Sequence, residues 1–344
     1  MHIRGFASDN NSGVHPKVML ELNNVNRGHV VGYGDDGYTK AAEELFKEHL
    51  GRDAEAFFVF NGTGANIMGL SAVTRSWNAV LSAYTAHIVQ DECGAPEKNT
   101  GAKVLTVDTP DGKLKPEYLG KHMHGFGVEH HSQPKVISIS QPTEMGTVYS
   151  VEEIKALAAY AHSNGMLLHM DGARLANAAI SLSLPFKAFT TDAGVDLLSF
   201  GGTKNGMMYG EAVVFLRPGI SDGFKYIRKQ SMQLASKMRF IAAQYIAYLR
   251  DEVWKECATH SNNMAKKLEK ALRSVEGIRI TQKVDANGIF VIMPRKVAEK
   301  LNKEYFFYPW DEAAEEYRLM TSWDTTDEDI DTFVSVLKSL LKKE

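Results

Sequence analysis

The chain has 344 residues, of which 44% are hydrophobic and 24% charged, and this composition is typical of globular proteins. Its formal net charge of −3 provides no basic excess, which argues against nucleic acid as a partner. Because its longest apolar stretches fall far below about 18 residues, we expect no membrane partner. The two cysteines, Cys93 and Cys257, are too few for a disulfide framework and favour a cytoplasmic location.

The first 36 residues are rich in glycine, asparagine and aspartate, and they predict an irregular arm that packs on the body or on a partner subunit. Residues 37–50 have helical periodicity. A short apolar strand at 56–60 then leads through a glycine-rich turn, 61–66, into a helix. Further predicted strands, each followed by a loop or helix, lie at 103–108, 135–141, 166–173, 195–200 and 210–218.

Strands that alternate with helices predict an α/β fold with a mostly parallel sheet and helices on both faces. After residue 250 the pattern changes to a long amphipathic helix, 252–275, three short strands and a closing helix. We therefore predict an N-terminal arm (1–36), a large ligand-binding domain (37–250) and a small α+β C-terminal domain (251–344). In such sheets ligands bind beyond the carboxyl ends of the strands.

The turn NGTGAN (61–66) lies between a predicted strand and a helix. Its glycines allow backbone N–H groups to converge, and the helix N-terminus adds positive potential, so the turn is a candidate phosphate cradle with the Thr63 hydroxyl as an extra donor. The alternative is an ordinary tight turn. Neither GxxxxGK[ST] nor GxGxxG occurs here, which argues against a nucleoside triphosphate or dinucleotide site.

Two other strand ends carry chemically active residues. Asp171 follows an apolar strand, where a carboxylate either pairs with a cation or caps the next helix. Lys204 lies in the glycine-rich turn SFGGTKNG (199–206), where it is either an amine nucleophile or a solvated loop residue. Cradle, carboxylate and a lysine 33 positions later follow the order expected for a pyridoxal-phosphate site.

With these motifs the sequence resembles the fold-type I pyridoxal-phosphate enzymes, and among them the L-threonine aldolase (aromatic amino acid β-eliminating lyase) family. The resemblance covers most of the chain, and DGAR with the spaced lysine is its most specific part. The matching stretches are SDN (8–10), YGDDGYT (33–39), NGTGAN (61–66), TAHIVQDECGA (85–95), GTV (146–148), HMDGARLANA (169–178) and SFGGTKNG (199–206).

The resemblance implies pyridoxal 5'-phosphate as the cofactor of the 37–250 domain and assigns a role to each matching residue. Lys204 corresponds to the Schiff-base lysine, Asp171 to the partner of the pyridinium nitrogen, and His87 to a histidine that stacks on the ring and also serves as a base. The phosphate loop would consist of Gly62, Thr63 and Gly64.

For the amino acid substrate, Arg318 and Ser8 correspond to the residues that hold its carboxylate, and Arg174 to an arginine beside cofactor and substrate. Tyr33, together with the loosely aligned Lys229 and Arg239, corresponds to residues that reach the site from a neighbouring subunit. The resemblance thus implies a homodimer, or a homotetramer built from dimers, with its sites at the dimer interface.

One position departs from the family pattern. Where many members read ENTHN around an active-site histidine, this chain reads QPTEMG (141–146), with Glu144 in place of the histidine. A carboxylate there can still accept a proton, directly or through water. It also bears on which β-substituent the site accepts.

The activity implied is cleavage of the Cα–Cβ bond of a β-hydroxy-α-amino acid, with L-threonine or L-allo-threonine giving glycine and acetaldehyde. Alternatives are β-elimination, racemisation, or an aldolase for a bulkier substrate such as phenylserine. A partner-binding protein without catalysis is a third hypothesis. Four histidines at 122–131 lie in a glycine-containing segment that predicts a loop, so we expect no metal.

Overall fold

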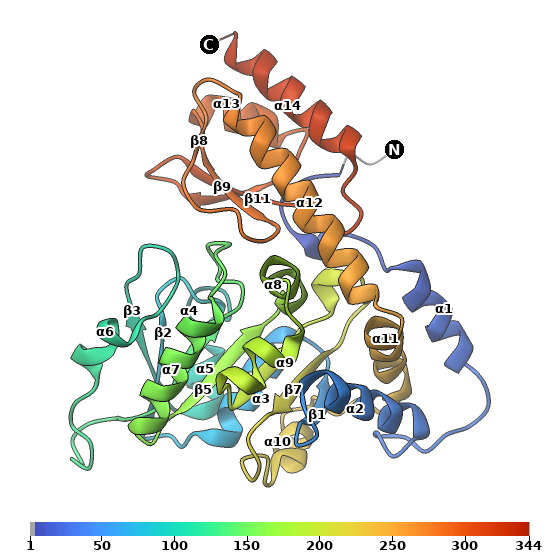
Figure 1. The fold of residues 1–344 in the computed structure, drawn as a ribbon, viewed down its shortest axis with the longest axis vertical. Helices are drawn as coiled ribbons and strands as arrows, with labels where there is room; N and C mark the ends of the chain where they lie inside the picture. The colour runs from blue at the N-terminus through green and yellow to red at the C-terminus, as the bar shows by residue number, and fades with distance from the viewer. Residues whose placement is uncertain (1–3, 344) are drawn as a thin grey trace.

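The computed structural model describes residues 4–343, and Figure 1 shows a large sheet-based body below a smaller one. The proposed arm (1–36) and small domain (251–344) include residues 1–3 and 344, which lie outside the described residues. None of the helices formed by the described chain is long and apolar enough to cross a membrane.

Within the described chain, the large body is built on a seven-stranded sheet in the order β1-β7-β6-β5-β4-β2-β3. Strand β7 runs antiparallel to both of its neighbours, and the other pairings are parallel. The predicted α/β class with a mostly parallel sheet is therefore confirmed. The strands are β1 (Glu55–Val59), β2 (Asn78–Ala83), β3 (Lys103–Val107), β4 (Gln133–Ser140), β5 (Leu167–Gly172), β6 (Leu197–Phe200) and β7 (Glu211–Phe215).

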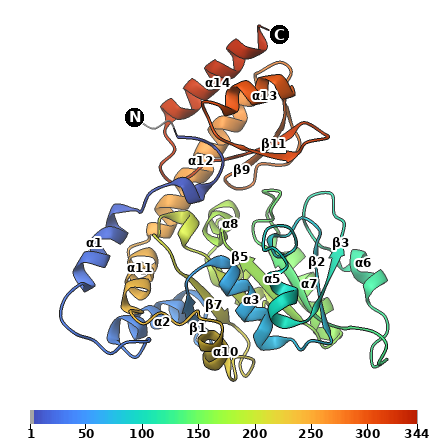
Figure 2. The same cartoon turned by 180° about the vertical axis from the view of Figure 1, so that it is seen from behind.

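Helices cover both faces of this sheet. Successive strand residues point to opposite sides, and apolar side chains on both sides need to be buried. Phe200 and Val214 belong to the core under one layer of helices, whereas Leu197 and Val213 pack under the other. The first layer includes α2 (Gly37–Leu50), α7 (Val151–Ser163), α8 (Leu175–Leu182), α9 (Phe186–Phe189) and α11 (Arg239–Arg250). The second includes α3 (Gly62–Val73) and α10 (Phe224–Gln230), with α5 (Ala95–Thr100) against α3, as Figure 2 shows.

The smaller body contains a second, antiparallel sheet of four strands within the described residues, in the order β10-β11-β9-β8. A long helix, α12 (Val253–Arg273), runs from the large body into it (Figure 1). The closing helix begins with a capping box formed by Thr326 and Asp329. The remaining elements are β8 (Arg279–Ile280), β9 (Gly288–Ile292), β10 (Tyr308–Asp311), β11 (Glu316–Met320), α13 (Arg295–Asn302) and α14 (Asp327–Leu341).

The N-terminal arm differs from the prediction because it contains a helix, α1 (Pro16–Val25). Pro16 occupies the first turn and the His15 side chain caps the Lys17 N–H, which are ordinary start signals for a helix. The helix packs on α11. Further upstream, Phe6 donates its N–H to the Phe306 carbonyl and joins the core of the smaller body.

Candidate active site

A cavity of about 1030 Å³ lies beyond the carboxyl ends of the parallel strands and is also bounded by β10 and β11 of the smaller body. This is the position that the sheet topology predicts for a ligand. Six of the predicted site residues line it: Ser8, His87, Glu144, Arg174, Lys204 and Arg318.

Asp171 and Lys204 are brought together by two adjacent strands. Asp171 pairs with Ser199 in the register of β5 and β6, and Lys204 follows β6 in a short 3-10 turn, Thr203–Asn205. The two strand ends are in tight contact, since a Cβ at Gly201 would lie 2.5 Å from the Ala173 carbonyl oxygen. Only glycine fits at that position, and it allows the lysine turn to pass beside the aspartate.

The Asp171 carboxylate is buried and held by two donors. Its Oδ1 accepts the Ala173 N–H at 3.0 Å, and its Oδ2 accepts Nδ2 of Asn66 at 2.8 Å. The alternative of a helix N-cap does not hold, because Arg174 occupies the N-cap position of α8. The Asp171 carboxylate retains lone pairs with which to accept a further hydrogen bond from a bound group.

The predicted phosphate loop forms the first turn of α3. The Asn61 side chain caps this helix by accepting the Gly64 N–H at 2.7 Å, and Gln233 accepts the Phe60 N–H at 3.0 Å. A Cβ on Gly64 would lie 2.7 Å from Oε1 of Gln233, so a larger residue here would displace the Gln233 side chain. The leading N–H groups of a helix have no partner within it, which leaves those of Gly62 and Thr63 available to an anion.

The same helix connects the phosphate loop to Asp171. Asn66 lies one turn after Gly62, and it is the residue that donates to the aspartate. The loop and the carboxylate are therefore fixed relative to each other by a single helical turn, as two anchors of one ligand should be.

His87 begins α4 (His87–Gln90), and its Nδ1 lies 2.8 Å from Oε1 of Glu92. Burial lowers the pKa of His87, but the hydrogen bond to Glu92 and the charges of Glu144 and Asp171 outweigh it despite the opposing charge of Lys204, so the pKa is raised above its ordinary value. His87 therefore lies close enough to Asp171 and Lys204 for both charges to affect its pKa.

Arg318, on β11, is prepared for an anionic partner. Among residues 4–343 no group accepts a hydrogen bond from its buried Nε. Its guanidinium lies 5.9 Å from the ring centre of Tyr308 and 5.7 Å from that of Trp310, and NH1 is 3.9 Å from Oε2 of Glu144. Burial, with the charge of Arg174, lowers the pKa of Arg318 from its ordinary value, although Glu144 opposes this. A substrate carboxylate would supply the missing acceptor.

Arg174 is held by a residue that sequence reasoning did not single out. Its Nε and NH2 donate to the two oxygens of Asp9 at 2.7 and 3.0 Å. Burial raises the pKa of Asp9, but the charge and hydrogen bonds of Arg174, the charge of Lys204 and a hydrogen bond from Asn287 outweigh it, so the pKa is lowered. Asp9 was visible only as part of the SDN stretch.

Tyr33, Lys229 and Arg239 do not line this cavity. The Tyr33 side chain is 53% exposed, and the Lys229 ammonium lies 5.1 Å above its ring. Arg239 donates to the carbonyls of Arg27 and Gly28. Their proposed roles in a neighbouring subunit stay predictions.

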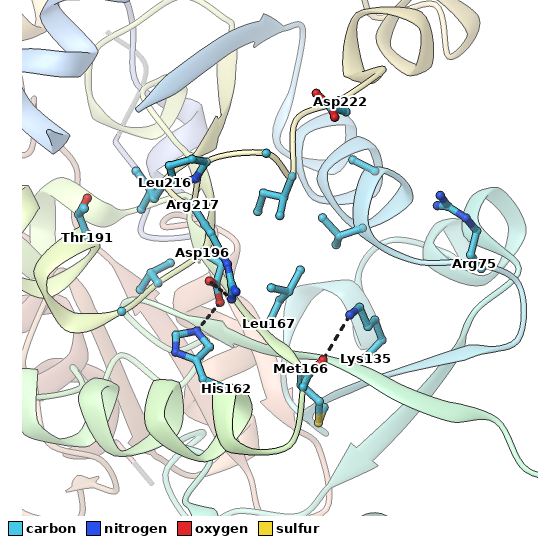
Figure 3. Close-up of a pocket in the computed structure, with 18 residues that line it drawn as sticks. Arg75, Lys135, His162, Met166, Leu167, Thr191, Asp196, Leu216, Arg217 and Asp222 are labelled. Atoms are coloured by element: carbon cyan, nitrogen blue, oxygen red, sulfur yellow. Dashed lines mark hydrogen bonds and ion pairs between the residues drawn. The ribbon is translucent and has the colours of Figure 1, made fainter. Parts of the chain in front are cut away.

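Figure 3 shows a second cavity, of about 770 Å³. It lies at the other ends of the parallel strands, where β4, β5 and β6 begin. There the buried carboxylate of Asp196 accepts the Leu168 N–H, lies 2.8 Å from Nε2 of His162 and pairs with Arg217. These contacts join β5, β6 and the end of β7. No predicted site residue lines this cavity.

Asp171 and the turn Gly62–Gly64 do not line the first cavity, but together with the residues that do, they fit pyridoxal phosphate. A phosphate matches the N-terminal turn of α3, a ring nitrogen matches the buried carboxylate of Asp171, and an aldehyde carbon matches the Lys204 amine. The geometry that supports this fit is the single helical turn between Gly62 and Asn66, which sets the first two anchors.

The fold and this set of anchors define a fold-type I pyridoxal-phosphate enzyme. A family model described as beta-eliminating lyase matches residues 5–296. Low specificity L-threonine aldolases of Pseudomonas aeruginosa and of a Pseudomonas species are 41% identical over 326 and 322 residues, covering 94% and 93% of both chains. The structure of Leishmania major threonine aldolase superimposes with a TM-score of 0.92 at 33% identity, over 98% of this chain and 99% of that one.

The chain therefore belongs to the beta-eliminating lyase family, and the predicted resemblance is confirmed. Members of this family are lyases that depend on pyridoxal phosphate.

Proposed function

We propose that this chain cleaves the Cα–Cβ bond of a β-hydroxy-α-amino acid, with L-threonine or L-allo-threonine giving glycine and acetaldehyde. The observation that carries the proposal is one cavity holding an amine, a carboxylate-binding arginine and two proton acceptors: Lys204, Arg318, His87 and Glu144. The L-threonine aldolases that are 41% identical over nearly the whole chain support it.

Four parts of the chain would hold the cofactor. The Lys204 amine would tether it, Asp171 would keep its ring nitrogen protonated, the turn at Gly62–Gly64 would bind its phosphate, and His87 would pack on its ring. Pyridoxal phosphate, when bound, supplies an electron sink for the charge that develops at Cα.

The substrate carboxylate would bind to Arg318 as a two-pronged hydrogen-bonded pair, with Ser8 as a further donor. Arg174, locked by Asp9, adds positive charge beside the cofactor and the substrate. This binding orients the Cα–Cβ bond that breaks, and orientation of this kind is a large part of enzymatic rate enhancement.

The β-hydroxyl proton must leave as the bond breaks. His87 and Glu144 both line the cavity and both are proton acceptors, so either residue, or a water that they hold, would take it. General-base assistance is typically worth about 10²–10⁴-fold in rate.

The proposal is tested by measuring glycine and acetaldehyde from L-threonine and L-allo-threonine with the pyridoxal-phosphate-loaded protein. We expect equal amounts of the two products, and loss of turnover in Lys204→Ala. Normal turnover in Lys204→Ala would refute the assignment of Lys204.

A bulkier β-substituent is the second candidate, and aromatic residues in the cavity favour it. Tyr308 and Trp310 line the cavity beside Arg318, where they offer apolar and aromatic surface to a ring such as that of phenylserine. Comparing kcat/KM for phenylserine and threonine in wild type and Trp310→Ala decides this. A selective loss for phenylserine supports the candidate, and an equal loss for both substrates contradicts it.

We also propose that copies of this chain associate, as a homodimer or as a homotetramer built from dimers, and that the protein is cytoplasmic. Large apolar side chains are exposed on the arm and near α10: Met19, Leu20, Val31 and Met232 are 46%, 60%, 64% and 82% exposed. A subunit contact over these segments would remove their exposed apolar side chains from water. The cytoplasmic location is supported by the two cysteines, which are both free of disulfides.

A further inference from the structure

Glu92 lies at the centre of a buried hydrogen-bonded group that the proposed reaction does not yet explain. Its Oε1 is 2.8 Å from Nδ1 of His87 and accepts Nδ2 of Asn66 at 2.9 Å. The same amide nitrogen donates to Asp171 at 2.8 Å. The residue is only 4% exposed. One amide therefore bridges two buried carboxylates, and one of these also holds the histidine.

The arrangement has the distances of a cation site but contains a different bridging group. One donor atom each from His87, Glu92 and Asp171 lie within 4.8 Å of one another. Two adjacent carboxylates repel unless protons or a cation lie between them. The two amide protons of Asn66 already meet this need, one toward each carboxylate. The amide thus links the two carboxylates, while Oε2 of Glu92 and Oδ1 of Asn66 stay buried without a hydrogen-bond partner in the described chain.

Glu92 determines how His87 presents its ring. A carboxylate that accepts from Nδ1 fixes the proton on that nitrogen and turns Nε2 away from it. Within the described chain, His87 is the one basic side chain that forms an ion pair with Glu92. The other charged groups that act on His87 are Glu144, Asp171 and Lys204, which come from three separate segments.

Asn66 extends the same control to Asp171. By donating to Oδ2 it sets the plane of the carboxylate, while the Ala173 N–H holds Oδ1. His87, which would stack on the cofactor ring, and Asp171, which would contact its nitrogen, are therefore held by the same pair of residues, Asn66 and Glu92.

We propose that Glu92 is a positioning residue of this enzyme, which through His87 and Asn66 holds the stacking histidine and the pyridinium-binding aspartate in one hydrogen-bonded unit. This inference rests on the proposed function for its kinetic consequences. Its consequence for cofactor binding does not depend on turnover.

The test compares Glu92→Gln and Glu92→Ala with Glu97→Gln, a matched control at an exposed position on the neighbouring helix α5. Glutamine retains the shape but removes the charge, whereas alanine removes both. The measurements are the pyridoxal-phosphate Kd by absorbance and the pH profile of kcat/KM with the loaded enzyme.

We expect Glu92→Gln to move the acidic limb of the pH profile to lower pH by about one unit, because His87 loses a neighbouring negative charge. Glu92→Ala should also raise the cofactor Kd about tenfold or more, as removal of a group that orients a ligand commonly does. Glu97→Gln should match the wild type in both measurements.

A pH profile and a cofactor Kd that stay at wild-type values in both Glu92 variants would overturn the inference. If wild type binds the cofactor but releases no glycine, the proposed function fails, and the Kd comparison still decides the role of Glu92. Should Glu92→Ala not fold, Glu92→Asp, which retains the charge at a greater distance, takes its place in the Kd measurement.

Discussion

At the scale of single residues, the cavity is notable for arginines that are prepared in different ways. Arg174 is already paired with Asp9 through both oxygens, whereas Arg318 retains a buried Nε without an acceptor in the described chain. A buried donor without a partner costs about 1–3 kcal/mol. Substrate binding would remove this cost at Arg318 but would gain nothing similar at Arg174.

We therefore predict that Arg318→Lys raises KM for threonine about tenfold or more, because an ammonium cannot form the two parallel hydrogen bonds of a guanidinium. The cofactor Kd should stay near its wild-type value, since Arg318 is assigned to the substrate. Steady-state kinetics and absorbance titration measure the two quantities. An unchanged KM with a weakened cofactor would place Arg318 at the cofactor instead.

At the scale of elements, the turn that carries Lys204 is held by a side chain at the start of β7. Glu211, the first residue of that strand, accepts the Gly202 N–H at 2.9 Å. Burial raises the pKa of Glu211 to about 7, despite opposing hydrogen bonds and the charge of Lys204. A buried carboxyl with a raised pKa prefers to be neutral.

The sign of its effect on stability follows from this shift. The folded-state pKa of about 7 lies above the ordinary 4.5, so ionisation penalises the folded state increasingly as pH rises from about 4.5 to 7. We predict that Glu211→Gln, which stays neutral, gains stability relative to wild type between pH 5 and pH 8, by about 2 °C or more in Tm. Thermal unfolding at the two pH values measures this. A Tm difference that is the same at both values would contradict it.

Local patterns in the sequence predicted the elements that carry the site, but not the contacts between them. Strand–turn–helix punctuation and the order of motifs were enough to place Asp171 and Lys204 at strand ends, and the structure adds that the two strands are neighbours. The supporting residues were missed because their partners are distant: Asp9 and Arg174 are 165 positions apart, and Asn66 and Asp171 are 105 apart. Such pairings depend on how the chain closes on itself, which spacing alone does not encode.

At the scale of the whole molecule, the three residues that the resemblance assigns to a neighbouring subunit do not line the cavity of their own chain. Tyr33 and Lys229 lie together at the surface, and Arg239 is occupied with backbone carbonyls. The cavity in the chain thus has its amine and its carboxylate-binding arginine but not these residues. A second copy would complete it if the proposed dimer forms.

Mixed dimers distinguish a shared site from a self-contained one. Suppose that Lys229 binds the cofactor phosphate in the site of the neighbouring subunit. A dimer of one Lys204→Ala chain and one Lys229→Ala chain then contains one intact site, because the intact Lys204 of one chain faces the intact Lys229 of the other. Each variant alone should be weakly active, and co-refolding equal amounts should restore about a quarter of wild-type turnover, as random pairing in a twofold assembly requires. If Lys229 acts within its own chain, every site in the mixed dimer is defective and mixing restores nothing, so turnover after mixing decides between the two arrangements.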